Sequence, residues 1–176
     1  MHAKKFIIIQ ELDSMSLYRN LIVCFHQAGC GKSFLLKLLI DAVKYLEMES
    51  GDELERPRVL TMAPTANAAS IIGGKTIESC LGINPHEKWN YVKPGQERQS
   101  QLKFTYENVS TIFLDECSML GANKLAKMNY QVQSFQEGSA KREFFGKKNI
   151  IFGGDLRYAL KVTIFKSIFI HFFLIS

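Results

Sequence analysis

The pattern of apolar and polar positions predicts two kinds of segment along the chain, strands and helices. Short apolar runs, several of them rich in β-branched residues, predict buried strands at 20–25, 58–63, 110–114 and 149–152. Apolar residues at helical spacing predict a helix that follows Ser33 and ends near Glu47, and further helices are expected at 68–72 and 119–135. Strands that alternate with helices predict an α/β fold in which a mainly parallel sheet is covered on both faces.

A glycine-rich turn joins the first predicted strand to the first predicted helix. It occupies residues 26–33 and has the sequence HQAGCGKS. Backbone N–H groups of such a turn can wrap a phosphate, Lys32 would reach the terminal phosphates, and the Ser33 hydroxyl would hold Mg²⁺. The predicted nucleotide-binding residues are Gln27, Ala28, Gly29, Cys30, Gly31, Lys32 and Ser33. His26 stands where the full pattern has a glycine, and an ordinary glycine turn that caps a helix is the alternative.

Two acids, Asp115 and Glu116, follow the third predicted strand directly. In phosphate-loop enzymes an acid at this place holds Mg²⁺, and an adjoining carboxylate can deprotonate the attacking water. The acids could instead simply begin the next helix, where negative charge is favoured. The presence of both the glycine-rich turn and the acid pair favours a site for a nucleoside triphosphate.

Composition narrows the class of protein only a little. With 176 residues, 47% hydrophobic and 22% charged, the chain has the size and composition of one globular domain. The net charge of +5 suits a polyanionic partner but is also common on plain surfaces. The four cysteines have no metal-ligand spacing, which predicts reduced thiols in the cytosol or nucleus. The apolar segment 162–176 is shorter than the ~20 residues of a membrane span, so no membrane partner is expected.

Five strings occur in an order that resembles a known family. They are AGCGKS at 28–33, APTANAA at 63–69, GKTI at 74–77, LDECSM at 114–119 and GD at 154–155. Together they resemble the first motor domain of superfamily-one 5′→3′ DNA helicases, most of all the RecD-related petite-integration-frequency family. The resemblance implies a three-layer αβα, RecA-like P-loop NTPase fold. It also implies Mg²⁺–ATP hydrolysis coupled to movement along single-stranded DNA, with roles in DNA repair, recombination and telomere maintenance in the nucleus.

The resemblance also assigns roles to individual residues. Lys32 would bind the β- and γ-phosphates, Ser33 and Asp115 would hold Mg²⁺, and Glu116 would be the catalytic base. The predicted path of the DNA backbone is lined by Pro64, Thr65, Asn67, Lys75 and Thr76. Gln10 would contact the adenine.

The same resemblance divides the chain into parts. Residues 1–19 are a lead-in, 20–156 the motor domain with an exposed insertion at 83–101, and 157–176 an apolar tail outside the family pattern. In the insertion, Trp89 and Tyr91 could stack on bases or pack back onto the domain.

Three features depart from the family pattern. His26 replaces a glycine, and Glu78 replaces a histidine that faces DNA, where a carboxylate would repel phosphates. The family's γ-phosphate-sensing glutamine and its two prolines do not follow Gly154-Asp155.

We also expect a second RecA-like domain to be missing from this chain, as in a truncated reading frame. The arginine finger of that domain is worth about 10³–10⁵ in turnover in phosphate-loop enzymes, so hydrolysis by this chain alone would be very slow. Two other readings remain: a degenerate module that binds nucleotide or DNA without catalysis, and a small phosphate-loop kinase.

Overall fold

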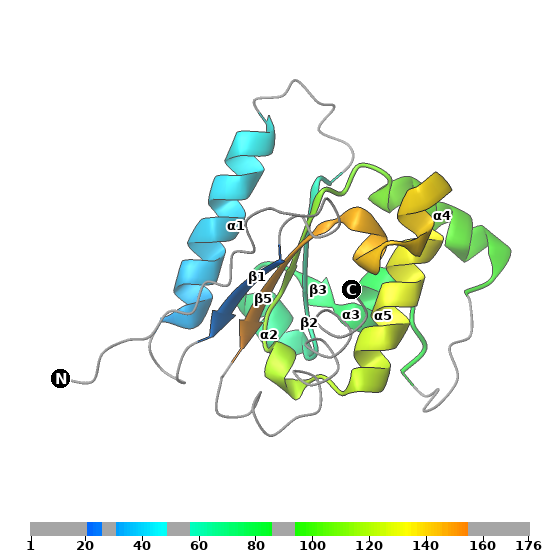
Figure 1. The fold of residues 1–176 in the computed structure, drawn as a ribbon. Helices are drawn as coiled ribbons and strands as arrows, with labels where there is room; N and C mark the ends of the chain where they lie inside the picture. Colours follow the sequence, from blue (N-terminus) through cyan, green and yellow to red (C-terminus); the bar gives the residue numbers. More distant parts are fainter. Residues whose placement is uncertain (1–20, 26–30, 49–56, 86–93, 155–176) are drawn as a thin grey trace, which may run out of the picture.

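The computed structural model describes residues 21–25, 31–48, 57–85 and 94–154, and these form a parallel sheet between two layers of helices (Figure 1). The strands lie in the order β1-β5-β4-β2-β3, and every neighbouring pair is parallel. Their bounds are β1 (Leu21–Phe25), β2 (Val59–Ala63), β3 (Lys75–Thr76), β4 (Thr111–Leu114) and β5 (Asn149–Gly154). The predicted parallel sheet is therefore confirmed.

The inner strands are apolar because both of their faces are buried. All residues of β2 and β4 are buried, and successive side chains point to opposite faces. Leu60 and Met62 belong to the hydrophobic core on one face, whereas Val59 and Ala63 belong to the core on the other. A strand that is buried on both faces gives a continuous apolar run, which is the pattern that made these strands recognisable in the sequence.

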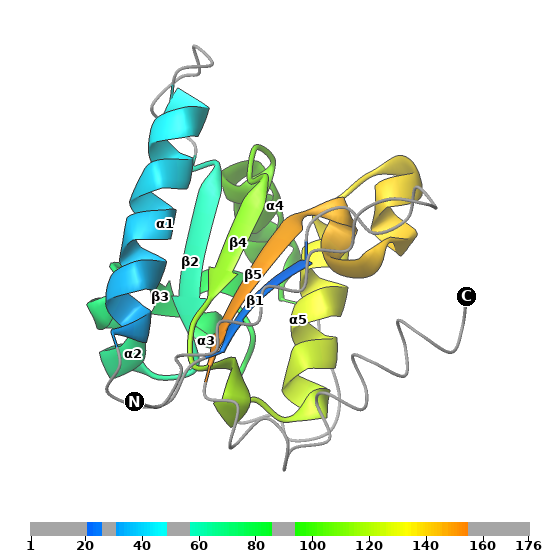
Figure 2. The same cartoon turned by 60° about the vertical axis from the view of Figure 1, so that its left-hand side comes forward.

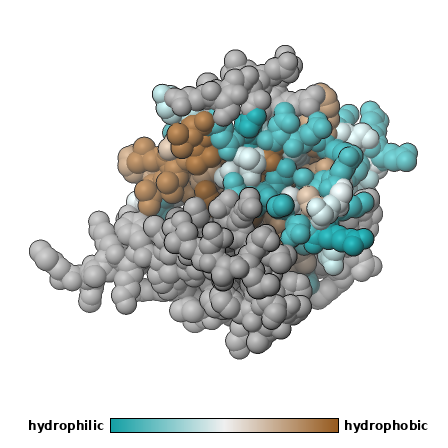
Figure 3. Space-filling model, turned by 45° about the horizontal axis from the view of Figure 1, so that its top comes forward, coloured by the Kyte–Doolittle hydropathy of each residue, from teal (hydrophilic) through white to brown (hydrophobic). Residues whose placement is uncertain are grey.

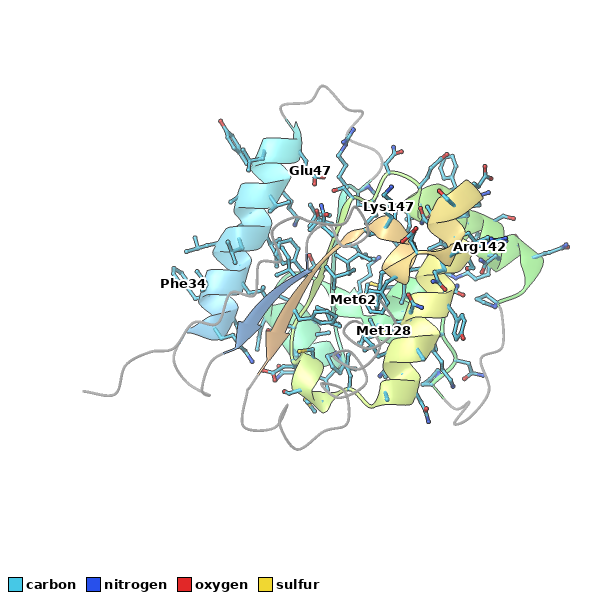
Figure 4. The ribbon with its side chains drawn as sticks, in the orientation of Figure 1. Phe34, Glu47, Met62, Met128, Arg142 and Lys147 are labelled. Atoms are coloured by element: carbon cyan, nitrogen blue, oxygen red, sulfur yellow. The ribbon has the colours of Figure 1, made fainter. Side chains whose placement is uncertain are left out.

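One face of the sheet is covered by α1 (Lys32–Met48) and α2 (Ala66–Ile71). Leu36 and Ile40 of α1 are buried one helical turn apart and share a core with Phe113 and Ile151 of the sheet. Figure 2 shows α1 lying along this face. The helix also carries exposed apolar side chains, and Figure 3 shows hydrophobic residues gathered on that side of the molecule. They are Phe34, Leu38, Tyr45 and Leu46, of which Phe34 points away from the sheet in Figure 4.

The opposite face carries α3 (Ile77–Leu81), α4 (Gln96–Tyr106) and α5 (Ala122–Ser134). Buried residues of α5 share one core with the sheet, and Met128 lies with Met62 between the helix and the strands (Figure 4). Three short 3₁₀ segments complete this layer: Cys117–Met119, Gly138–Arg142 and Phe144–Lys147. Two helical layers around one sheet are the predicted three-layer architecture.

Several elements differ from the predictions. The last residues of the predicted insertion 83–101 are the first half of α4, whose Leu102 and Tyr106 are buried in the core. The short elements β3 and α3 were not predicted as strand and helix. Finally, α5 begins at Ala122 rather than at Met119, because Glu116 adopts a left-handed conformation and the chain then makes a 3₁₀ turn.

Some predicted features lie outside the described residues: the lead-in 1–19, the tail 157–176, and Trp89 and Tyr91 of the insertion. Within the described part, no helix is long and apolar enough to cross a membrane. Cys80 and Cys117 are free, buried thiols there.

Candidate nucleotide and magnesium site

The described part of the predicted nucleotide-binding turn, Gly31, Lys32 and Ser33, lies at the carboxyl edge of the sheet. Parallel strands end at one common edge, where α1 begins at Lys32 and where Asp115 follows β4. Gly31 stands just before α1 with φ +85°, a conformation that glycine adopts without strain. Gln27, Ala28, Gly29 and Cys30 lie outside the described residues, as does His26. The structure therefore tests the position of Gly31, Lys32 and Ser33 only.

The ammonium group of Lys32 contacts both acids. Its Nζ atom lies 2.8 Å from Oε1 of Glu116 and donates a hydrogen bond to it. The same nitrogen lies 3.7 Å from Oδ1 of Asp115. The lysine side chain is only 13% exposed, so these charges interact more strongly than they would in bulk water. A phosphate that approached this edge would compete with Glu116 for the same ammonium group.

Asp115 is the most deeply buried acid of the site, with 1% of its surface exposed. Its Oδ1 accepts a hydrogen bond of 2.8 Å from the backbone N–H of Glu116, and its Oδ2 accepts one of 3.4 Å from the Ser33 hydroxyl. Burial raises the pKa of the Asp115 carboxyl above its ordinary value, while the Glu116 N–H and the Lys32 charge act in the opposite direction. The carboxylate is thus fixed between the start of α1 and the end of β4.

Glu116 has an unusual backbone conformation, with φ 51° and ψ 35°. Few residues other than glycine adopt this left-handed region, and the cost is about 1–3 kcal/mol. The turn lets two successive carboxylates point toward the same ammonium group, since Glu116 and Asp115 both contact Lys32. With 32% of its side chain exposed, Glu116 is the more accessible of the two acids. Such local strain is typical of a residue whose side chain must be aimed at a site.

Gly153 of β5 makes room for the Asp115 carboxylate. The register pairs Leu114 with Phe152, so the next residues on the two strands, Asp115 and Gly153, are neighbours. A Cβ atom at position 153 would lie 2.8 Å from Oδ1 of Asp115. Gly153 is not among the predicted site residues, because its closeness to Asp115 depends on the register between β4 and β5.

The residues that converge here fit a magnesium ion. Mg²⁺ prefers oxygen ligands and is commonly bound by one or two carboxylates together with substrate phosphates. Asp115 Oδ2 and Ser33 Oγ lie 3.4 Å apart, which brings a carboxylate and a hydroxyl together beside the lysine predicted to bind phosphate. The structure thus brings together four of the predicted site residues: Lys32, Ser33, Asp115 and Glu116.

The predicted DNA-binding residues lie at the same edge of the sheet, around the end of β2. Pro64 follows β2 directly, and Thr65 is the N-cap of α2, where its hydroxyl accepts a hydrogen bond from the N–H of Ala68. Asn67 is exposed in the first turn of α2. The Thr65 hydroxyl therefore caps α2, and its role in DNA binding stays a prediction.

Lys75 and Thr76 form β3, which pairs with the last residues of β2. Lys75 is exposed, and Thr76 is the N-cap of α3, where its hydroxyl accepts a hydrogen bond from the N–H of Ser79. Glu78, the acid expected to repel phosphates, forms an ion pair with Lys124 of α5. The sequence alone does not predict this pair, because its two residues lie on different helices.

The chain matches a known protein family. A family model described as PIF1-like helicase matches residues 5–167, which is more than half of the chain. The chain belongs to the PIF1-like helicases. The family predicted from the motifs is thereby confirmed. The match extends beyond the predicted motor-domain boundaries at 20 and 156, and those boundaries stay predictions.

Individual PIF1-like helicases resemble the chain over much of its length. The ATP-dependent DNA helicase PIF1 of Saccharomyces cerevisiae (strain YJM789) is 31% identical over 130 residues, which are 73% of this chain. The chain covers 14% of the length of that relative.

Solved structures of the family share the fold. A Pif1 helicase from Bacteroides in complex with ADP-AlF3 and ssDNA matches with a TM-score of 0.50 and 26% identity, over 74% of this chain and 27% of that one. Pif1 helicase from Candida albicans matches with a TM-score of 0.59 and 21% identity, over 80% of this chain and 32% of that one. The likeness confirms the predicted RecA-like fold.

Proposed function

We propose that this chain is the ATP-binding first motor domain of an ATP-dependent 5′→3′ DNA helicase. One observation carries the proposal: Lys32, Ser33, Asp115 and Glu116 converge at the carboxyl edge of the sheet in a PIF1-like helicase. A solved relative was crystallised with ADP-AlF3 and ssDNA, which supports the same two ligands, ATP and single-stranded DNA, for this chain.

The site residues divide the chemistry between them. Lys32 binds the β- and γ-phosphates and offsets the negative charge that develops on them. Ser33 and Asp115 would hold Mg²⁺, and the ion would neutralise part of the negative charge on the phosphates. Glu116, the more exposed acid, accepts a proton from the attacking water. Its hydrogen bond from Lys32 must loosen before it can act as that base, and phosphates that draw the lysine away would release it.

In this proposal, the rate of ATP hydrolysis depends on a second protein domain that contacts the site. A second RecA-like domain would close the site and supply an arginine finger, worth about 10³–10⁵ in rate. We infer that residues 1–176 alone bind Mg²⁺–ATP but hydrolyse it very slowly. The complete helicase would act in the nucleus, in DNA repair, recombination and telomere maintenance.

Isothermal titration calorimetry with Mg²⁺–ATP tests the first step. The wild-type chain should bind, and Lys32→Ala should abolish binding, because it removes the phosphate contact and leaves two acids without their cation. Lys44→Ala is a matched control, since Lys44 is an exposed lysine of the same helix. Absence of binding at millimolar nucleotide would refute the proposal. Affinity for single-stranded DNA that does not respond to ATP would support the degenerate module instead.

A further inference from the structure

An acid lies close to the predicted path of DNA. Glu78 stands in the first turn of α3, two residues after Thr76. Helix geometry separates the Cα atoms of such residues by about 5 Å. Charges on such a short segment that lie within the Debye length of about 8 Å are only partly screened at physiological salt. An uncompensated carboxylate at this position would therefore repel a phosphate bound at Lys75 or Thr76.

The structure gives this carboxylate a dedicated partner. Nζ of Lys124, in the first turn of α5, forms an ion pair with Oε1 of Glu78, and both side chains are partly buried. A cation in the first turn of a helix opposes the helix dipole, and no acid in that turn compensates for it. The position of Lys124 is therefore unfavourable for α5 itself. The ion pair with Glu78 of α3 offers a different reason for a lysine at this position.

We propose that Lys124 is a positioning residue for single-stranded DNA, acting through Glu78. By neutralising that carboxylate it keeps the surface beside Lys75 and Thr76 attractive to phosphates. This inference rests on the proposed function and on the DNA path that the family resemblance predicts. It differs from two simpler roles for the pair: direct binding of phosphate by Lys124, and mere fastening of α3 to α5.

A double-mutant cycle separates these roles. The assay is fluorescence anisotropy of a labelled oligo(dT) with the full chain at low salt. Lys124→Met should raise the Kd about three- to tenfold, because it exposes one carboxylate to the DNA in partly desolvated surroundings. In a Glu78→Gln background the same substitution should change the Kd less than about twofold, because the charge that it uncovers is gone. The effect of Lys124→Met should also shrink as salt is raised.

Two controls complete the design. Lys124→Arg keeps the charge and should retain wild-type affinity. Lys44→Met removes one exposed lysine on the opposite helical layer and should leave the Kd close to that of the wild type. Urea unfolding of each variant then separates a loss of affinity from a loss of stability.

Each other outcome overturns the inference. If Lys124→Met weakens binding equally in both backgrounds, Lys124 contacts DNA directly. If it lowers stability without changing the Kd, the pair only fastens the helices. Lys75→Ala tests the predicted DNA path itself. If Lys75→Ala weakens oligo(dT) binding and Lys124→Met does not, this inference is refuted while the proposed function stands. A wild-type chain that binds no oligo(dT) refutes the proposed function first, and this inference with it.

Discussion

Replacement of Gly153 by alanine tests whether the Asp115 carboxylate is held against β5. The new methyl group would lie 2.8 Å from Oδ1 of Asp115 and 3.2 Å from Cδ2 of Leu36. Comfortable contacts between heavy atoms are about 3.5–4.0 Å, so the carboxylate would have to move by roughly 0.5–1 Å. Asp115 has little room to move, since it is buried and accepts hydrogen bonds from the Glu116 N–H and the Ser33 hydroxyl.

The cost combines two effects of similar size. Overpacking of a buried site costs about 1–3 kcal/mol. Weakening a hydrogen bond to a charged acceptor costs up to about 1.5–3 kcal/mol, and because the two effects share one movement they do not add fully. A loss of about 2–4 kcal/mol is expected. With a slope of about 2 kcal/mol per M, it lowers the urea midpoint by about 1–2 M.

Chemical denaturation followed by circular dichroism measures this loss. Gly121→Ala is the matched control, because nothing lies within 4 Å of a Cβ there and φ is −80°. It should change the stability by no more than about 1 kcal/mol. Gly153→Ala should also weaken Mg²⁺-dependent nucleotide binding at least tenfold, at about 1.4 kcal/mol per tenfold change. A variant with wild-type stability and nucleotide affinity would refute the close approach of Asp115 to β5.

Glu116→Gln should keep nucleotide binding, measured by calorimetry, but lower the ATPase rate of a complete helicase at least about 100-fold, because an amide cannot accept the proton. Burial raises the pKa of the Cys80 thiol from 9.0 to about 11, so the unfolded chain loses this proton first and stability should fall as pH rises above 9. Urea midpoints between pH 9 and 10 should show this fall, and Cys80→Ala should lessen it. Tyr106→Phe should cost about 1–3 kcal/mol in urea unfolding, because the tyrosine hydroxyl donates a buried hydrogen bond of 2.7 Å to the Cys80 carbonyl, which would lose its partner.

The predictable parts of the fold are those with a strong periodic or apolar pattern. The strands β2, β4 and β5 are buried on both faces and give continuous apolar runs, so their positions followed from the sequence. The helix α4 is not predicted because only Leu102 and Tyr106 of its eleven residues are buried, so its sequence shows no clear apolar stripe. The two-residue strand β3 has no pattern at all, and only its pairing with the end of β2 defines it.

The part of the candidate site that follows from the order of strands and motifs along the chain was predictable. Strands that end at one edge bring Lys32 to Asp115 and Glu116, so their convergence followed from a parallel sheet. Gly153 depends on the register between β4 and β5, which the sequence does not state. The pair of Glu78 and Lys124 depends on how two helices pack. Both features are tertiary, and neither leaves a local pattern.

The pairing of β1 has a consequence for synthesis of the chain. In the described sheet β1 pairs with β5 alone. Leu21 of β1 lies opposite Ile150 of β5, although the two residues are close to opposite ends of the described part of the sequence. At about 5–20 residues per second, a ribosome needs roughly 6–25 s to make the intervening chain. During that interval the apolar strand that precedes Lys32 has no hydrogen-bonding neighbour and offers an open edge to other nascent chains. The strand gains that neighbour only once β5 has been made.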